Sequence, residues 1–491
     1  MVARAVAAGD AKHASKKDVE LLKKLCVEFK DELAALGAKT DKLDKRVTKL
    51  EKGIGSWNIS GRFKFDVAMT GGDNGKDSAW TKQRGKYDFT RDVARLFLRR
   101  QITEDTYFDS QFRIASDWGG GDTAGHGDSK GFSTRKFYVG TKLPFWGIEV
   151  KIGRSQFDWE ELYDLYDYNS LFGAWRFDGF WFTKKWSKVQ ADFLVGRNQS
   201  GWKRNEVFYD SFTEAKLQSG EENFLYSLNL KWTPTDKLTL GAMGYWQQGD
   251  KGDEIPGTAA TKAPGWNDKN LWEKDIEDVP ATDPSYRGIG NIQTYGVVAG
   301  YKFTNDVALK GIYYWQKLSS DRNDILDEAG VLDKSQYAFK AILDVKQNLL
   351  KFTDLWVEYS QMKNGFGGNN GAGAADNNMY TLGGKSGEPS VFYVRPVNNE
   401  TSKLWYIRAE QKWNKKWSTF LRYVNANWGT DGVDNAYDWG VGVKYKLNPA
   451  ITFMLAYDEI NYGDNIAPVT AGGSDLKGKD RVIFFQTDVK F

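Results

Sequence analysis

The sequence is poor in the residues on which most catalytic and metal sites depend. Its 491 residues contain a single cysteine, Cys26, and two histidines, His13 and His126. One thiol excludes a disulfide framework and a thiolate metal cluster, and two isolated histidines argue against zinc binding or histidine-based catalysis. No Walker loop, complete EF-hand loop or Gly-x-Ser-x-Gly elbow is present. We therefore predict that the protein is not an enzyme and has no metal centre.

A strong net charge and long apolar runs are also missing. The net charge of +3 is too small to indicate nucleic acid as a partner. No run of about 18 apolar residues exists, which excludes transmembrane helices. The first residues, Met-Val-Ala-Arg-Ala-Val-Ala-Ala-Gly, lack the apolar core of a secretory signal. We expect residues 1–16 to be a linker left by the processing or truncation of a longer protein.

Aromatic residues, by contrast, are abundant, with 20 Trp, 24 Tyr and 29 Phe. Without a long apolar run, this abundance suits a transmembrane β-barrel with aromatic girdles; on composition alone, a soluble all-β protein is the alternative. The last segment alternates Phe485, Val489 and Phe491 on one face with Gln486 and Asp488 on the other, which is typical of a strand between two solvents. Its aromatic end resembles the terminal signal of bacterial outer-membrane barrels.

Alternating segments of this kind recur from residue 56 to the end of the chain. They come in pairs joined by polar turns of about 2 to 6 residues, with longer connections between the pairs, as in outer-membrane barrels with short periplasmic turns and long external loops. We predict an all-β transmembrane antiparallel β-barrel over residues 56–491, with about 18 strands and 16 as the alternative. The predicted strands are 56–69, 92–103, 106–118, 133–144, 146–156, 174–184, 188–198, 223–233, 237–248, 292–303, 307–317, 335–346, 353–363, 401–413, 417–428, 436–447, 450–462 and 480–491.

An amphipathic segment precedes the predicted barrel. Its apolar residues alternate three and four apart, flanked by Lys, Asp and Glu, which is the a/d seam of an α-helical coiled coil. A helix over residues 17–52 would be about 50 Å long. We expect a parallel self-associating coil in the periplasm, most naturally of three chains; a helix folded onto the barrel is the alternative. The seam residues are Val19, Leu22, Cys26, Phe29, Leu33, Leu36, Thr40, Leu43, Val47 and Leu50.

The junction between coil and barrel carries a family resemblance. Lys42-Leu-Asp-Lys-Arg-Val-Thr-Lys-Leu-Glu51 leads into Gly55-Ser-Trp-Asn-Ile-Ser-Gly61, and this order resembles OmpM-type porins. Those porins carry an S-layer-homology domain, a periplasmic coil and an outer-membrane barrel. The resemblance implies a homotrimer in the bacterial outer membrane, among its lipid and lipopolysaccharide. It also implies that the complete protein tethers this membrane to peptidoglycan through an S-layer-homology domain, which this sequence lacks.

A second resemblance lies at Val150-Lys-Ile-Gly-Arg-Ser-Gln156, which is similar to the end of the fifth strand in general trimeric porins, before the loop that folds into the pore. The loop that follows here is rich in carboxylates. We predict that these acids face wall arginines across a constriction and set a transverse field; ordinary solvated loop acids and lumen arginines are the alternative. Arg154 has the parity of outward Ile152, so its inward placement requires the strand to end or bulge. The predicted constriction residues are Asp158, Glu160, Glu161, Asp164, Asp167, Arg62, Arg95, Arg99, Arg113 and Arg154.

These patterns together predict an outer-membrane porin for passive diffusion of small hydrophilic solutes and ions. The alternatives are a substrate-selective channel and a mainly structural anchor with a plugged barrel. We expect no cofactor, with one reservation: loops 249–291 and 364–400 are rich in Gly, Asp and Asn, which are compatible with calcium. A flexible surface loop is the simpler interpretation of both segments.

Overall fold

The structure, a computed structural model, describes the barrel strands and a short part of the amino-terminal segment. The predicted Asp167, most of the two loops considered for calcium, and every seam residue except Phe29 lie outside the described residues. The described residues are 20–21, 23–25, 27–30, 57–72, 87–114, 132–165, 171–172, 175–198, 208–209, 216–217, 224–248, 291–319, 324, 327–330, 333–363, 365–366, 381–382, 392–393, 399–463 and 478–491.

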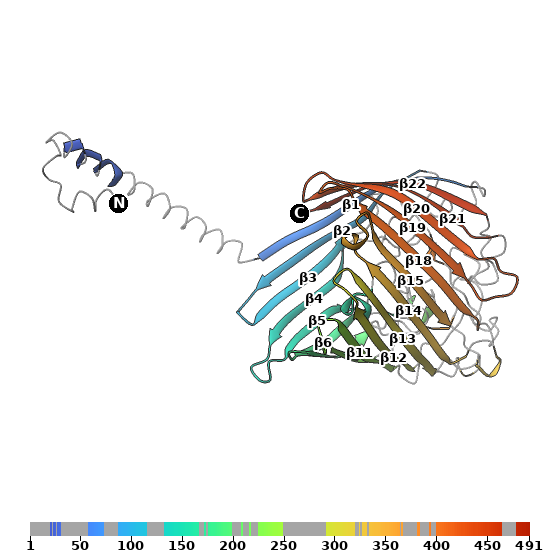
Figure 1. Cartoon of the computed structure of the whole chain (residues 1–491). Coiled ribbons are helices and arrows are strands. Elements are labelled where there is room, and N and C mark those ends of the chain that lie inside the picture. The colour runs from blue at the N-terminus through green and yellow to red at the C-terminus, as the bar shows by residue number, and fades with distance from the viewer. Residues whose placement is uncertain are drawn as a thin grey trace. The chain divides into compact units, whose positions relative to one another are not determined.

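Eighteen strands form one antiparallel sheet (Figure 1). Each strand pairs with the next one of this sheet along the chain, and β1 pairs with β22 from Arg62↔Lys490 to Gly72↔Asp480. This last pairing closes the sheet into a barrel, so the prediction of 18 strands rather than 16 is confirmed. The strands are β1 (Trp57–Gly72), β2 (Tyr87–Gln101), β3 (Thr106–Ile114), β4 (Phe132–Lys142), β5 (Glu149–Phe157), β6 (Trp175–Lys185), β7 (Val189–Asn198), β10 (Phe224–Trp232), β11 (Leu238–Gln248), β12 (Asn291–Lys302), β13 (Val307–Ser319), β14 (Ser335–Val345), β15 (Asp354–Lys363), β18 (Thr401–Lys412), β19 (Trp417–Asn427), β20 (Ala436–Lys446), β21 (Ile451–Asn461) and β22 (Lys479–Lys490).

Short additional elements lie in the connections between these strands. Two helices of one turn, α4 (Trp159–Leu162) and α6 (Gln347–Leu350), follow β5 and β14. Two small hairpins pair β8 (Phe208–Tyr209) with β9 (Lys216–Leu217) and β16 (Thr381–Leu382) with β17 (Phe392–Tyr393). Of these elements, α4 has the contacts that define the candidate site.

The two faces of the sheet differ as the alternation in the sequence predicts. On β10, Leu228 and Leu230 are 38% and 44% exposed, whereas Ser227 and Asn229, which alternate with them, are fully buried. The exposed set belongs to the outer face of the barrel and the polar set to the inner face. A strand with this alternation separates an apolar exterior from a polar interior.

Three glycines lie directly opposite one another on the inner face of β5, β6 and β7: Gly153, Gly179 and Gly196. Gly153 has a φ of +124°, a backbone conformation that residues with a side chain rarely adopt. A Cβ at Gly179 would collide with the backbone carbonyl of Val195 on β7. Glycine is therefore required at these positions, and this part of the inner wall carries no side chains.

The amino-terminal unit, Met1–Asn58, is described in part. Its described residues between 20 and 30 are helical, and Phe29 is 59% exposed in the single chain. No helix within the described residues is long and apolar enough to cross a membrane. The coiled coil itself stays a prediction.

Candidate functional site

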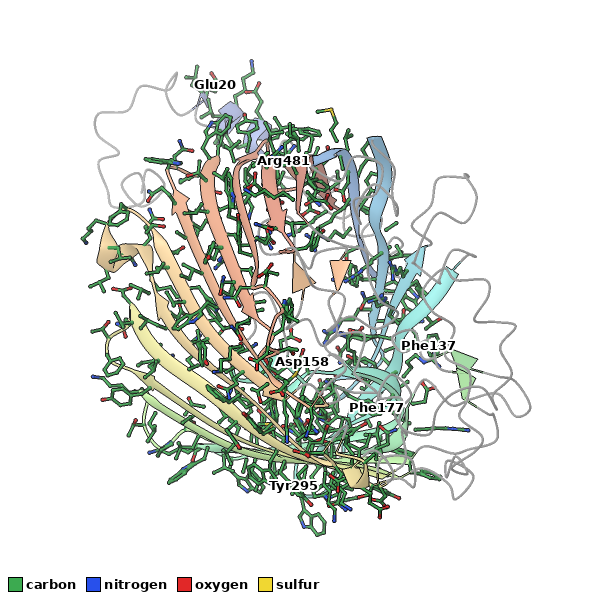
Figure 2. The ribbon with its side chains drawn as sticks, turned by 90° about the vertical axis from the view of Figure 1, so that its right-hand side faces the viewer. Glu20, Phe137, Asp158, Phe177, Tyr295 and Arg481 are labelled. Carbon is green, nitrogen blue, oxygen red and sulfur yellow. The ribbon has the colours of Figure 1, made fainter. Side chains whose placement is uncertain are left out.

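The connection between β5 and β6 begins with a capped helical turn on the inner side of the barrel (Figure 2). Oδ1 of Asp158 accepts hydrogen bonds from the backbone amides of Glu160, at 2.9 Å, and Glu161, at 3.3 Å. This is the ordinary N-cap function of an aspartate, which satisfies amides that have no partner within the helix. The cap sets the start of α4 immediately after Phe157, the last residue of β5.

Glu160 attaches this loop to a distant part of the wall. Its Oε2 lies 2.8 Å from Nζ of Lys340 on β14, and both side chains are fully buried. The other oxygen, Oε1, accepts hydrogen bonds from the backbone amides of Leu171 and Phe172, at 2.7 and 3.0 Å. Around the ring, β6, β7, β10, β11, β12 and β13 separate β5 from β14. The loop therefore extends across the inner side of the barrel.

Further contacts fix the loop along β10 and β13. Nζ of Lys310 lies 2.7 Å from Oδ2 of Asp164 and 3.0 Å from Oδ2 of Asp344. The Tyr163 hydroxyl donates to the side-chain oxygen of Asn229 at 2.7 Å, and Lys231 donates to the carbonyl of Leu162 at 2.6 Å. Polar groups from two wall strands, β10 and β13, thus hold three consecutive residues of the loop, Leu162, Tyr163 and Asp164.

Aromatic packing fills the space around these polar contacts. Trp159 and Phe172 of the loop are fully buried, with ring centroids 5.6 Å apart. Phe172 also contacts the rings of Tyr245 on β11, at 5.3 Å, and Tyr314 on β13, at 5.6 Å. Large buried aromatic side chains contribute substantial apolar burial. The loop is therefore a packed part of the barrel interior.

A cavity of about 270 Å³ remains between the other side of the loop and the wall formed by β4, β5 and β6. Nζ of Lys151 lies 3.7 Å from the ring centroid of Trp181 and 5.7 Å from that of Tyr138, which is cation–π geometry. The lining comprises Lys136, Tyr138, Lys151, Ser155, Gln156, Asp158, Glu161, Leu162 and Trp181. Two lysines of the wall and two acids of the loop thus share one cavity.

Asp158 has unusual acid–base properties in this position. Burial, together with the nearby carboxylate of Glu160, raises the pKa of Asp158 to about 7. The two amides that it caps favour the charged form but do not offset burial. An ordinary aspartate is ionised far below neutral pH, whereas Asp158 changes charge near it.

The predicted arginines lie apart from these contacts. Arg62 forms a bidentate pair with Asp488 across the β1–β22 closure, with both N–O distances at 2.8 Å. Arg99 lies opposite Asp109 and 4.6 Å from the ring centroid of Tyr107. Arg95 and Arg113 lie opposite each other on β2 and β3. These residues belong to the inner wall, but the loop acids Glu160 and Asp164 pair with lysines.

The inward placement considered for Arg154 is wrong. The strand neither ends nor bulges there, because pairing with β6 continues to Phe157↔Trp175. Arg154 lies opposite Phe137, which is 50% exposed, and forms a bidentate pair with Asp178 at 2.7 and 2.8 Å. Directly opposite residues share a face of the sheet. Arg154 therefore follows its parity and lies on the outer face.

Sequence reasoning missed the cations that meet the loop. These are Lys136 and Lys151 at the cavity, and Lys310 and Lys340 at the anchor. Inward parity marks all of them as lumen residues, and that signal was available in the sequence. Parity does not give the position of each lysine around the barrel. That position brings Lys340 to Glu160, although the two residues are 180 apart in the sequence.

Comparison with known proteins gives structural likenesses alone. No family model and no curated protein matches the sequence. Among solved structures, the chain is similar to the outer membrane protein OprD from Pseudomonas aeruginosa, with 11% identity, a TM-score of 0.48 and coverage of 89% of this chain and 93% of that chain. It is also similar to OccK11 (OpdR) of the same organism, with 9% identity, a TM-score of 0.47 and coverage of 89% of this chain and 97% of that chain. A third similar structure is the trimer form of OmpT, an outer membrane protein of Vibrio cholerae, with 12% identity, a TM-score of 0.37 and coverage of 89% of this chain and 99% of that chain. Likenesses this distant do not assign the chain to a family.

Proposed function

We propose that this chain is a porin of the bacterial outer membrane, through which small hydrophilic solutes and ions diffuse passively. The observation that carries the proposal is the anchored β5–β6 loop. It crosses the inner side of a closed barrel and leaves a polar cavity of about 270 Å³ beside a charged wall. A loop in this position narrows the path through the barrel, and charged side chains at a narrow point discriminate among permeating ions.

The outer face supports a membrane location. Trp146, Trp186, Trp413 and Trp417 stand at short turns between strands and are 78%, 56%, 65% and 45% exposed. Exposed tryptophans at one end of a barrel suit the interface between lipid and water, because the indole ring is part apolar and part polar. The outer face between these tryptophans and the opposite end of the strands is apolar, so this surface fits a lipid bilayer.

Conductance in a planar lipid bilayer tests the channel function. We expect stepwise current increases as single barrels insert, each step stable over time. An inserted protein that stays silent would contradict the porin and favour a plugged barrel with an anchoring function. Insertion is checked independently by protease protection in lipid vesicles, so that silence cannot be attributed to missing protein.

One observation favours the second candidate, a substrate-selective channel. Inward-facing apolar side chains such as Tyr314, Tyr406 and Trp428 are almost fully buried and belong to one large cluster with the loop residues. A lumen filled to this degree suits a narrow channel rather than a wide diffusion pore. Selectivity would appear as saturation of flux with one solute class and linear flux with others.

The finer parts of the proposal concern assembly. We propose a homotrimer held by the coiled coil of residues 17–52, resembling OmpM-type porins, with the complete protein tethered to peptidoglycan and the barrel surrounded by lipopolysaccharide. Calcium in the long loops belongs to the same set of proposals. Deleting residues 17–52 should leave a folded barrel that no longer tethers the envelope. A single-chain mass for the intact protein by light scattering in mild detergent would contradict the trimer.

A further inference from the structure

The cavity beside the loop contains two wall lysines that form no ion pair with a carboxylate of the described residues. Lys136 and Lys151 both line it, and Lys151 contacts two aromatic rings. Within the described part of the chain, neither ammonium group lies within ion-pair distance of a carboxylate oxygen. Lys151 is partly buried, and the wall carboxylates that act on it, Glu149, Asp192 and Asp109, lie beyond ion-pair distance, so they offset its lost hydration only in part. These two groups are therefore disposed to bind an anionic group from outside.

The opposite side of the same cavity is acidic. Asp158 and Glu161 belong to the loop, and the Glu161 side chain is exposed. A ligand with negative groups alone would be repelled by this side, and a ligand with positive groups alone would be repelled by the lysines. Favourable contacts on both sides require one molecule that carries both charges.

Size and apolar lining narrow the ligand further. The cavity volume of about 270 Å³ lies just below the usual range of ligand sites, about 300–1,000 Å³. Trp181 and Leu162 add apolar surface to the lining. Gly153 lies between Lys151 and Ser155 on the inner face of β5 and adds no side chain to the cavity.

We propose that this cavity binds a small zwitterion of amino-acid size, with its carboxylate on Lys136 and Lys151 and its ammonium group towards Asp158 and Glu161. The carbon chain then lies against Trp181 and Leu162. This inference rests on the proposed channel function and assigns its solute class. A permeating solute would occupy the site transiently on its way through the barrel.

Three related probes test the ligand class on the purified full chain. Norvaline carries both charged groups, pentanoate lacks the ammonium group, and butylamine lacks the carboxylate. Binding is measured by isothermal titration calorimetry in detergent and by current blockade in a planar bilayer. We expect norvaline to bind at least about tenfold more tightly than either analogue, because each analogue loses a charge-assisted contact. Equal binding of all three probes, or no binding of norvaline, would overturn the proposal.

Matched variants test the residues. Lys136→Gln and Lys151→Gln should each weaken norvaline binding about tenfold, and Glu161→Gln should weaken norvaline and leave pentanoate unaffected or tighter. Lys237→Gln, at an exposed turn between β10 and β11, is the control and should bind as the unmodified protein does. Undiminished binding by the Lys136→Gln/Lys151→Gln double variant would contradict the site. If one lysine variant fails to fold, the other variants and the three probes still decide the question.

The readouts also separate this inference from the channel itself. Ion conductance without norvaline binding would leave the porin intact and overturn the zwitterion site. Norvaline binding in detergent without conductance would keep the site and contradict the channel.

Discussion

The inner walls of the barrel on its two sides use lysine in opposite ways. On β13 and β14, Lys310 and Lys340 each lie between two carboxylates, and their side chains are 9% and 0% exposed. On β4 and β5, Lys136 and Lys151 line a cavity, and Lys151 contacts the rings of Tyr138 and Trp181. The same residue type therefore anchors a loop on one side and remains available to solutes on the other. What differs is distance: Lys310 and Lys340 have carboxylates at ion-pair distance, whereas those near Lys151 lie farther away.

The carboxylates are divided between the walls by the loop itself. Glu160 points to β14 and Asp164 to β13, whereas Glu161 lies at the cavity. Along one short turn, neighbouring acids thus serve different walls. Breaking the anchor should change the structure of the pore, and altering the cavity should change its selectivity while the structure persists.

The largest effect should come from Lys340→Met. This change leaves Glu160 and Glu358 buried without their cation, and breaking a buried pair in this way costs about 3–5 kcal/mol. We expect the loop to leave β14, which would be measured as larger and noisier single-channel conductance and as new protease cleavage within the loop. Lys310→Met is the comparison and should have a smaller effect, because Asp344 keeps Lys346 at 2.8 Å. Unchanged conductance in Lys340→Met would mean that the loop does not depend on this anchor.

The second largest effect should come from Gly153→Ala, which changes the barrel wall at β5 rather than the loop. The φ of +124° is strained for any residue with a side chain, and a Cβ there would meet the carbonyl of Phe137. Strain of this kind costs about 1–3 kcal/mol. We expect a lower urea midpoint for unfolding from lipid vesicles. Gly71→Ala is the matched control, because a Cβ at Gly71 meets nothing within 4 Å. Equal midpoints for the two variants would show that the wall adapts to a side chain at this point.

Part of the fold and of the candidate site could be predicted from the sequence, and part could not. The eighteen strands, their alternating faces and the acidic loop after β5 were all predictable, because period-two patterning and loop length are local properties. The partner of Glu160 was not, since Lys340 becomes its neighbour only when the ring closes with a particular register. For Arg154, the local rule was sufficient: its parity with Ile152 indicates the outer face, and the resemblance to general porins led to the opposite expectation.

The third effect is a pH dependence centred on Asp158. The pKa of about 7 is raised above that of an exposed aspartate, so docking of the loop is most favourable at low pH and weakens as pH rises through 7. Ionisation also adds a negative charge beside Glu161 and opposite Lys136 and Lys151. We expect cation preference to increase between pH 5 and 8, as measured by the reversal potential in a salt gradient. Asp158→Asn should lose this dependence; a persistent shift in that variant would assign the titration to another group.

The smallest effect should come from the arginines of β2 and β3. Arg99 is 56% exposed at its side chain and lies 4.0 Å from the Asp109 carboxylate, so solvent and a counter-charge both weaken its field. Lys136 and Lys151 line the cavity directly, where a local charge acts on a permeating ion with less screening. Reversal potentials should therefore shift clearly towards cations in Lys136→Gln/Lys151→Gln and only slightly in Arg99→Gln/Arg113→Gln. The Glu161→Gln variant should shift in the opposite direction, towards anions. A larger shift from the arginine pair than from the lysine pair would place the constriction at β2 and β3 rather than at the cavity. That result would support the constriction with wall arginines that the sequence predicts.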